Sequence, residues 1–288
     1  MKITKITFFI FWIISFLNAA IANETFEDWK INFKKFAINQ GISLKTLNEH
    51  IDKSKFLPDV IKYDRYQPEF YEDTKTYISK RTSNKKVKIG NKVYKNNTKK
   101  IDIISKKYAV DKNLLLSLMG IETNFGNYLG KMDIISSLAT LSFDKRRSEF
   151  FTKELIIALK LIDEKKINAE DLYGSWAGAF GNFQFMPSTI LNNAIDYNND
   201  NQIDLKSTED SFASAANYLS KMGWNTKDKC FSKIELDEKI PIKYLNYSAR
   251  KIRYKKKLSF YKKYIKNFTT EMGNDSQIVA IITPDKEI

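Results

Sequence analysis

Side chains with reactive sulfur or imidazole groups are nearly absent from this sequence of 288 residues. It contains one cysteine, Cys230, and one histidine, His50. A single cysteine excludes an intramolecular disulfide. The two scarcities together argue against a Cys–His dyad, a Ser–His–Asp triad and an H-E-x-x-H zinc site. We therefore expect His50 to be an ordinary surface or boundary residue, and we expect any proton transfer to depend on carboxylates.

Long hydrophobic runs are also scarce, and the longest lies at the N-terminus. The stretch from Ile6 to Leu17 is apolar, follows Lys2 and Lys5, and precedes a small-x-small pattern that ends at Ala22. These features predict a signal peptide over residues 1–22 and a periplasmic protein, with an uncleaved anchor as the alternative. No later run is long enough to span a bilayer, so we expect no transmembrane segment after cleavage, although association with a membrane stays open.

Negative charge is the minority sign, because 48 Lys and Arg residues face 34 Asp and Glu residues and the formal net charge is +14. In a cytosolic protein such an excess would suggest a nucleic-acid partner. In an exported protein the anionic cell wall or outer leaflet is the better partner. We find no Gly-rich phosphate loop and expect no nucleic acid.

Apolar residues recur mainly at the three- and four-residue steps of helices. Phe26, Trp29, Phe33 and Phe36 share one expected helix face, and the lysine-rich stretch 80–100 is expected to be weakly ordered surface. Ser43 and Asp111 are expected to begin further helices as N-caps, and 234–247 alternates as short strands do. The fold class predicted is mainly α (α+β). It comprises an N-terminal helical region (23–105), a core (106–228) and a small β-containing segment (229–288).

Glu122 is the strongest catalytic candidate. It ends a nearly unbroken apolar run that begins at Leu114 and stands directly before Thr123-Asn124-Phe125-Gly126. A carboxyl at the end of a buried helix loses hydration in its charged form, so its pKa is expected to rise, as a general acid at a glycosidic oxygen requires. The alternative is a glutamate whose side chain simply reaches solvent.

The segment from Gly174 to Ser188 reads G-S-W-A-G-A-F-G-N-F-Q-F-M-P-S and is rich in small and aromatic residues. Small residues allow a ligand to approach the backbone closely, or equally a tight crossing of two helices. Ser175, Asn182 and Gln184 supply hydrogen-bonding groups suited to acetamido and hydroxyl groups. The aromatic side chains, which are Trp176, Phe180, Phe183 and Phe185, are expected to offer faces on which sugars stack.

From Tyr108 to Trp224 the sequence resembles the catalytic core of the membrane-bound lytic murein transglycosylase B family. The resemblance rests on G-I-E-T-N-F-G from Gly120, L-A-T-L-S-F from Leu138, R-R-S-E-F-F from Arg146, the 174–188 segment, and A-S-A-A-N-Y-L from Ala213. It implies a lysozyme-like helical core that cuts peptidoglycan glycan strands without a cofactor. It also allows other cell-wall enzymes as partners.

The resemblance also implies roles for individual residues. Glu122 matches the catalytic glutamate, and the matching substrate-binding positions are Arg146, Arg147, Ser175, Gln184, Tyr218 and, through a looser alignment, Tyr77. Guanidinium groups suit the carboxylates of murein, although an arginine pair at a helix start is also ordinary surface. Helix periodicity allows Tyr218 to be partly core.

The mechanism that the resemblance implies needs one carboxylate. Glu122 protonates the oxygen between MurNAc and GlcNAc and then deprotonates the C6 hydroxyl that attacks C1, which leaves a 1,6-anhydro end. Ordinary glycosidases use two carboxylates. The only second acid in the signature segments is Glu149 of R-R-S-E-F-F, which is expected to pair with the arginines. Asp133 and Asp144 are the other acids nearest in sequence. A lysozyme-type hydrolase and a non-catalytic murein-binding scaffold remain alternatives.

A cation loop is the last candidate site. Asp196, Asn198, Asp200 and Gln202 alternate as oxygen ligands do in an EF-hand loop, but Ser207 occupies the twelfth position, where that loop carries Glu. The resemblance supplies Asp210 as the closing carboxylate, so a structural calcium ion is expected. The alternative is a helix-capping box that starts at Ser207.

In the family a final helix with a Tyr-Asn pair follows the C-terminal strands and completes the active-site wall. The sequence printed here reaches Ile288 without such a pair, shortly after an apolar stretch at 278–282. Either the sequence is truncated before that helix or this protein does without that wall, and both alternatives leave the closure of the groove and the catalytic rate open.

Overall fold

A computed structural model describes residues 24–66, 73–224, 226, 231–247 and 251–283. The predicted signal peptide at 1–22 and Cys230 lie outside the described residues. Within the described ranges, no helix is both long and apolar enough to cross a membrane.

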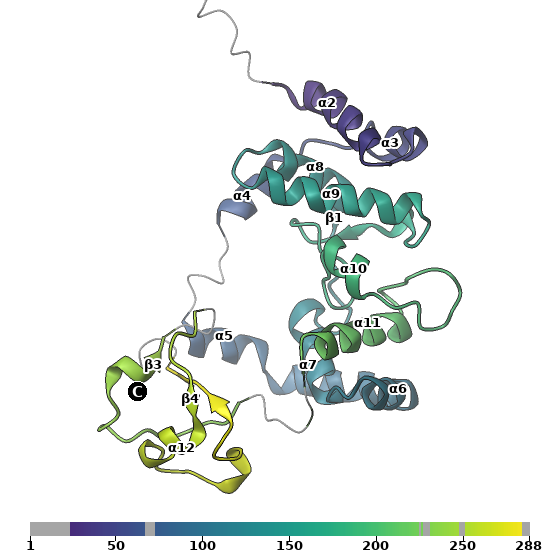
Figure 1. The fold of residues 1–288 in the computed structure, drawn as a ribbon. Helices are drawn as coiled ribbons and strands as arrows, with labels where there is room; N and C mark the ends of the chain where they lie inside the picture. The colour runs from purple at the N-terminus through teal and green to yellow at the C-terminus, as the bar shows by residue number, and fades with distance from the viewer. Residues whose placement is uncertain (1–23, 67–72, 225, 227–230, 248–250, 284–288) are drawn as a thin grey trace, which may run out of the picture.

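The described chain is mainly helical, which confirms the predicted fold class (Figure 1). The helices are α2 (Phe26–Asn39), α3 (Leu44–His50), α4 (Pro58–Arg65), α5 (Thr74–Arg81), α6 (Asn84–Tyr108), α7 (Lys112–Thr123), α8 (Ile134–Phe143), α9 (Ser148–Asp163), α10 (Pro187–Asn193), α11 (Thr208–Lys221) and α12 (Leu258–Tyr261).

Strands are short and pair in twos. They are β1 (Met132–Asp133), β2 (Tyr173–Gly174), β3 (Leu245–Asn246), β4 (Lys256–Lys257), β5 (Ile278–Val279) and β6 (Ile281–Ile282). β1 pairs with β2 and β4 with β5 in antiparallel fashion, whereas β3 pairs with β6 in parallel. The predicted β-containing character of the C-terminal segment is confirmed, but of the stretch 234–247, whose alternation predicted strands, only β3 and an isolated bridge at Leu236 are extended pairs.

Local capping chemistry explains where several helices begin. The hydroxyl of Ser43 accepts a hydrogen bond from the backbone N–H of Thr46, and the carboxylate of Asp111 accepts from Asn113 and Leu114. Each bond satisfies an N–H group that has no partner within its own helix. The predicted caps at Ser43 and Asp111 are confirmed.

The expectation of a weakly ordered stretch over 80–100 is wrong. Residues from Asn84 onward form α6, which Ser83 caps and which bends at Asn97, where φ is −128°. Most of its lysines are exposed, but Gly90, Ile101 and Ile104 are buried along one side. The helix is stabilised by the packing of this narrow stripe against other helices, chiefly α11, which is distant in the sequence, and the following helix α7.

The expected apolar face of α2 is partly wrong. Phe26, Phe33 and Ala37 are buried, but Phe36 is 45% exposed and lies at the edge of the stripe. Helical periodicity places residues on a face but does not fix how far the neighbouring elements extend over it.

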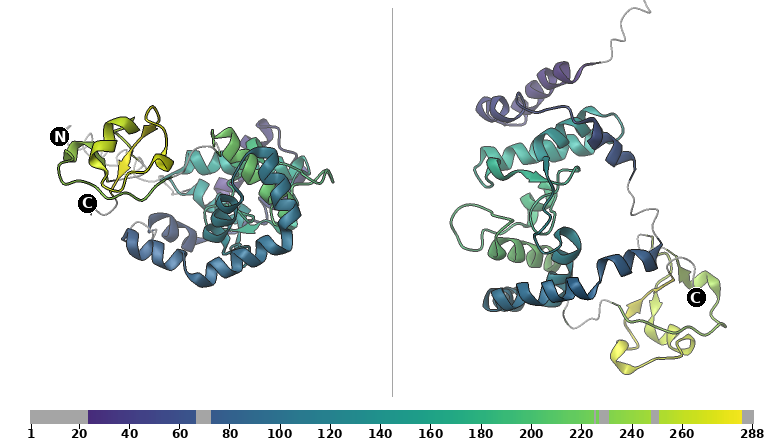
Figure 2. Two further views of the ribbon diagram at one scale, coloured as in Figure 1. Left: turned by 90° about the horizontal axis from the view of Figure 1, so that it is seen from below. Right: turned by 180° about the vertical axis from the view of Figure 1, so that it is seen from behind.

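Two hydrophobic clusters organise the described chain. The first extends from α2 to α11, with α8 buried at its centre against α9 and α4. The second is small and joins Leu245, Leu258, Tyr261 and Ile281 of the C-terminal segment. Figure 2 shows that segment beside α5 and apart from α8 and α9. The candidate catalytic glutamate belongs to an element of the first cluster.

Candidate active site

Glu122 lies in the last turn of α7, where the chain reverses sharply. Asn124, Phe125 and Gly126 all have positive φ, at 50°, 61° and 78°. Left-handed backbone is unfavourable for residues with a Cβ atom, so the surrounding contacts must hold this turn. The turn ends the helix directly after Glu122 and leaves the carboxyl at the helix terminus.

The side chain of Glu122 is exposed at the surface, and no hydrogen bond or ion pair of its carboxyl is found among the described residues. Burial by the surrounding protein atoms raises its pKa, in the direction that the sequence predicted. No described charged group, including Arg146 and Arg147, contributes to this shift. The carboxyl therefore favours its protonated form without being fully enclosed.

The ring of Phe125 fixes the turn against two helices. A Cβ atom built on Gly120 of α7 would lie 2.6 Å from Phe125 Cζ, and one built on Gly90 of α6 would lie 2.8 Å from the same atom. Neither distance is possible for a real methyl group. Gly90 and Gly120 thus leave the space that the ring occupies. Gly90 belongs to the stretch 80–100, which was expected to be surface.

A second contact joins the Glu122 turn to the Gly-rich segment. Thr123 is 1% exposed, and its hydroxyl donates to the carbonyl oxygens of Asn182 at 2.9 Å and Met119 at 3.1 Å. The same hydroxyl accepts from the backbone N–H of Gly126 at 3.0 Å. Because both motifs share these bonds, the structure brings together two segments about sixty residues apart.

The Gly-rich segment is packed mainly against the protein itself. A Cβ atom on Gly178 would lie 2.4 Å from the Leu138 side chain, and one on Gly181 would lie 2.5 Å from Leu205 Cβ. Both glycines have positive φ. Close packing of turns against Leu138 and Leu205 therefore explains these glycines, whereas the crossing of two helices expected as the alternative is not found here.

The expectation that the phenylalanines of this segment offer stacking faces is wrong. Phe180, Phe183 and Phe185 are 6%, 7% and 9% exposed, and Phe183 packs edge-on against Phe212 of α11. Trp176 is half-buried at the edge of the core. The three phenylalanines anchor the segment to the core, and Trp176 alone among the four keeps an accessible face.

Ser175 and Gln184 hold the shape of the segment. The Ser175 hydroxyl accepts from the backbone N–H of Ala179 at 3.0 Å. Gln184 has φ of 49°, and its side-chain nitrogen donates to the carbonyl oxygens of Gly181 at 3.0 Å and Leu129 at 3.2 Å. Leu129 follows the Glu122 turn, so Gln184 is a second link between the two motifs.

Tyr218 and Tyr77 occupy different surroundings. Tyr218 in α11 is half-buried, with its ring centroid 5.8 Å from that of Phe185, so it borders the Gly-rich segment. Tyr77 lies in α5 with the Arg81 guanidinium 3.7 Å from its ring centroid. The described contacts connect Tyr218, but not Tyr77, to the segments around Glu122.

Arg146 and Arg147 share one buried carboxylate. Asp64 of α4 is 3% exposed; it accepts from Arg146 Nε at 2.7 Å and lies 2.7 Å from Arg147 Nη2. Arg146 also donates to the Asp64 carbonyl oxygen at 2.7 Å. The prediction that Glu149 pairs with these arginines is wrong. Glu149 instead pairs with Lys153, one helical turn away, at 2.7 Å.

The acids nearest Glu122 in sequence are engaged elsewhere. Asp133 caps α8 by accepting from the Ser136 backbone N–H at 2.6 Å, and Asp144 pairs with Arg65 at 2.7 Å. Asp133, Asp144 and Glu149 thus have partners of their own, and burial is the cause of the raised pKa of Glu122, with no contribution from a described carboxylate.

The candidate cation loop is folded on its own side chains. The backbone N–H groups of Asp200 and Asn201 donate to Asp196, and both carboxylate oxygens of Asp210 accept backbone N–H groups, from Tyr197 and Asp204, at 2.9 Å. Ser207 caps α11 by accepting from the Asp210 backbone N–H, but the expected capping box is incomplete, because the Asp210 carboxylate accepts from Tyr197 and Asp204 instead of Ser207.

The donor set of this loop also suits a cation. Burial raises the pKa of Asp210, the two backbone N–H groups oppose the rise, and the charges of Asp196 and Asp200 add to it. Across the described parts of the chain, no three His, Cys, Asp or Glu side chains are grouped as metal ligands. Amide and carbonyl oxygens would therefore have to complete any coordination sphere, as calcium allows.

Sequence reasoning missed two residues of this region, Asp64 and Gly90. Asp64 joins arginines 82 and 83 positions later, and no local pattern marks it. Gly90 could have been found, because a glycine inside a helical segment indicates that another group approaches the backbone closely at that position.

A model of the family described as "Transglycosylase SLT domain" matches residues 25–287. Membrane-bound lytic murein transglycosylase B of Escherichia coli (strain K12) is 38% identical over 123 residues, which make up 42% of this chain and 34% of that protein. The match thus spans about a third of this relative's length.

Solved structures agree with the sequence match. SltB3 from Pseudomonas aeruginosa, in complex with NAG-anhNAM-pentapeptide, superposes with a TM-score of 0.81 at 27% identity, over 91% of this chain and 70% of that one. The Escherichia coli lytic transglycosylase Slt35, in complex with calcium, gives a TM-score of 0.72 at 26% identity, over 90% and 80% of the two chains.

Proposed function

This chain belongs to the transglycosylase SLT domain family, and from that premise we propose that it is a lytic transglycosylase that cleaves the MurNAc–GlcNAc bond of peptidoglycan. The products would be glycan strands that end in 1,6-anhydro-MurNAc. The observation that carries this proposal is that Thr123 and Gln184 join the turn of Glu122, whose pKa burial raises, to the Gly-rich segment.

The proposed reaction uses Glu122 twice. The protonated carboxyl gives its proton to the bridging oxygen as the bond to C1 of MurNAc breaks, and GlcNAc leaves with a new hydroxyl group. The resulting carboxylate then takes the proton of the C6 hydroxyl of the same MurNAc, whose oxygen bonds to C1. Glu122 is protonated again at the end, and no water is consumed.

The single carboxylate favours this route over hydrolysis. A hydrolase that works with two carboxyl groups keeps the second within about 5–9.5 Å of the first, either as nucleophile or as base for water. The nearby Asp133, Asp144 and Glu149 already have other partners. An attacking hydroxyl supplied by the substrate removes the need for a second group.

We propose that the residues around Glu122 bind the glycan. Ser175, Gln184 and Tyr218 border the Gly-rich segment that hydrogen bonds join to the Glu122 turn. Arg146 and Arg147 keep 44% and 40% of their side-chain surface exposed beyond Asp64, so their free N–H groups are available to substrate carboxylates. Tyr77 is included in this proposal because its surroundings in the sequence resemble, more loosely, those of a groove tyrosine of the family.

We further propose a structural calcium ion in the 196–210 loop, because a solved relative is a calcium complex and the clustered charges of the loop are of one sign. The side chains of Asp196, Asn198, Asp200, Gln202 and Asp210 would hold it. The ion would neutralise those charges and fix the connection between α10 and α11, without a part in the chemical steps.

We also propose that residues 1–22 are a signal peptide that directs export of the chain, and that the protein is periplasmic. The named Escherichia coli relative is membrane-bound, so association with a membrane is compatible with it. The domain limits at 23–105, 106–228 and 229–288 are part of the same proposal.

The test is product release from purified sacculi by the chain without residues 1–22. We expect soluble muropeptides with 1,6-anhydro ends, lighter by one water than those with reducing ends, and no release by Glu122→Gln. Glu149→Gln is the matched control and should release product normally. Tight binding to sacculi without release by the parent protein would show a murein-binding scaffold and contradict the enzyme assignment.

A further inference from the structure

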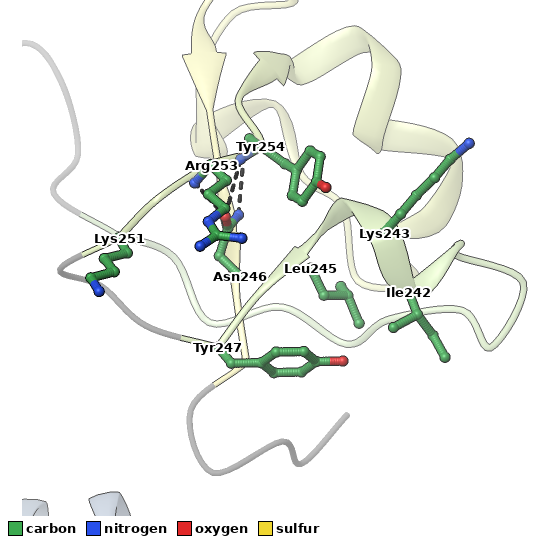
Figure 3. A pocket seen from close by; sticks show the side chains of 8 residues that line it. All are labelled: Ile242, Lys243, Leu245, Asn246, Tyr247, Lys251, Arg253 and Tyr254. Atoms are coloured by element: carbon green, nitrogen blue, oxygen red, sulfur yellow. Dashed lines mark hydrogen bonds between the residues drawn. The ribbon is translucent and has the colours of Figure 1, made fainter.

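A hollow of about 420 Å³ lies in the C-terminal segment, apart from the candidate active site (Figure 3). None of the catalytic or substrate-binding candidates lines it. Its lining residues all come from the stretch around β3, and they are Ile242, Lys243, Leu245, Asn246, Tyr247, Lys251, Arg253 and Tyr254. Its volume is within the range of about 300–1,000 Å³ that is typical of ligand sites.

Asn246 holds the floor of the hollow in place. It is 4% exposed, and its side-chain oxygen accepts the backbone N–H groups of Arg253 at 2.9 Å and Tyr254 at 3.1 Å. Its side-chain nitrogen donates to the carbonyl oxygens of Tyr254 and Ile281, both at 3.0 Å. Because both polar atoms of the Asn246 side chain are engaged, this side chain fixes the floor and is not itself available to a ligand.

Exposed apolar surface gathers around this floor. Ile242 is 65% exposed, Tyr247 44% and Tyr254 41%, while Leu245 is buried beneath them. Figure 3 shows the Tyr247 ring lying along the same side of the hollow as Leu245. Exposed aromatic and aliphatic faces beside a hollow mark a binding surface for a partly apolar ligand.

Positively charged side chains surround the hollow. Lys243, Lys251 and Arg253 form no ion pair with any described carboxylate. Residues 231–283 as a whole contain twelve Lys and Arg but five Asp and Glu. In Figure 3 Lys243 and Lys251 extend outward at opposite ends, and Arg253 lies between them beside Asn246. Since the three cations do not converge on one point, they suit an extended ligand with several negative charges better than a single small anion.

We propose that this hollow is a second peptidoglycan-binding site. The faces of Tyr247 and Tyr254 would receive sugar or peptide groups, while Lys243, Lys251 and Arg253 would bind the carboxylates of the stem peptides. The assignment rests on the proposed function, which supplies this polymer. A polymer offers many equivalent binding points, so a second site raises the effective concentration of substrate at Glu122 and keeps the protein on the sacculus.

The test measures cosedimentation of the full chain with purified sacculi, using Glu122→Gln as the background so that the polymer stays intact. Lys243→Gln combined with Lys251→Gln removes two charges at the hollow. Lys233→Gln combined with Lys239→Gln removes two exposed charges of the same segment outside it. We expect the first pair to weaken apparent affinity about tenfold and the second less than about twofold. Tyr247→Ala, which leaves the charge unchanged, should weaken binding as well.

Equal losses from both charge pairs, or unchanged binding by Tyr247→Ala, would overturn the proposal in favour of general electrostatic attraction. Binding to vesicles of anionic phospholipid that depends on the hollow, without such dependence on sacculi, would make it a lipid site instead. Melting temperatures equal to that of the background protein establish that the variants are folded. If the parent cuts sacculi and the hollow variants bind normally, this inference fails while the proposed function stands. If the parent neither cuts nor binds, the proposed function fails.

Discussion

Phe125 occupies the space that a side chain on Gly90 would need, with Phe125 Cζ 2.8 Å from the position of a Gly90 Cβ atom. Gly120 confines the same ring from α7, so the ring cannot yield without moving the left-handed turn that follows Glu122. We predict that Gly90→Ala lowers kcat about 10- to 100-fold, because a displacement of about 1 Å in a catalytic group has that effect. Steady-state kinetics on a soluble glycan fragment measure it, and KM should change little.

The control for this prediction is Asn91→Ala, the next residue on α6, whose side chain is exposed. It should retain the parent's kcat. Phe125→Leu introduced into Gly90→Ala shortens the side chain that clashes and should recover part of the loss. A Gly90→Ala protein with full activity would show that the ring does not position Glu122.

Asp64 is predicted to stabilise the fold through its two arginines. Its side chain is 1% exposed, so Asp64→Ala leaves Arg146 and Arg147 facing an apolar gap. Removing one partner of a fully buried pair costs about 3–5 kcal/mol, and because these arginines are partly exposed we expect about 2–3 kcal/mol. Urea denaturation measures the change in the free energy of unfolding.

Asp59→Ala on the same helix is the matched comparison, because Asp59 and Lys62 form an exposed pair. Its effect should stay below about 1 kcal/mol. Similar effects from both substitutions would mean that the arginine pair does not depend on Asp64.

The raised pKa of Glu122 predicts a stability difference that grows with pH. Burial favours the protonated carboxyl in the folded state, so its contribution to stability is full below the ordinary pKa and is lost as pH rises through the raised value. Glu122→Gln stays neutral, and its melting temperature relative to the parent should therefore be higher at pH 7.5 than at pH 4.

Glu149→Gln should behave in the opposite way. Lys153 lowers the pKa of Glu149 through a hydrogen bond and its charge, so that carboxylate stabilises the fold at pH 7.5 and loses its contribution as pH falls. If Glu122→Gln instead becomes relatively less stable at pH 7.5, the carboxylate of Glu122 has a stabilising partner and the raised pKa is wrong.

Calcium is predicted to raise the melting temperature, because an ion that binds only the folded chain stabilises it by about 2.7 kcal/mol at a hundred times Kd. Asp200→Asn removes one proposed ligand charge and should abolish most of the increase measured by calorimetry. Glu170→Gln, an exposed charge outside the loop, should leave it intact. An increase that persists in Asp200→Asn would place calcium elsewhere.

Local chemistry was readable from the sequence, and long-range packing was not. The caps at Ser43 and Asp111 and the raised pKa of Glu122 follow from a few neighbouring residues. The helix at 84–108 could not be predicted in this way. Its exposed lysines outnumber the few buried residues, and these are buried only because other helices cover them. The prediction of stacking faces at Phe180, Phe183 and Phe185 was wrong for a related reason. The sequence does not distinguish an aromatic side chain that faces a ligand from one that faces the core.

The attack of the substrate's own C6 hydroxyl on C1, with Glu122 as the single acid and base, is tested most directly by digesting sacculi in water enriched in oxygen-18. In the proposed reaction no water oxygen enters the product, so mass spectrometry should find 1,6-anhydro-MurNAc ends without the heavy isotope. Hydrolysis would add one heavy oxygen to every new end. Unlabelled anhydro ends would support the account, and labelled reducing ends as the main product would contradict it.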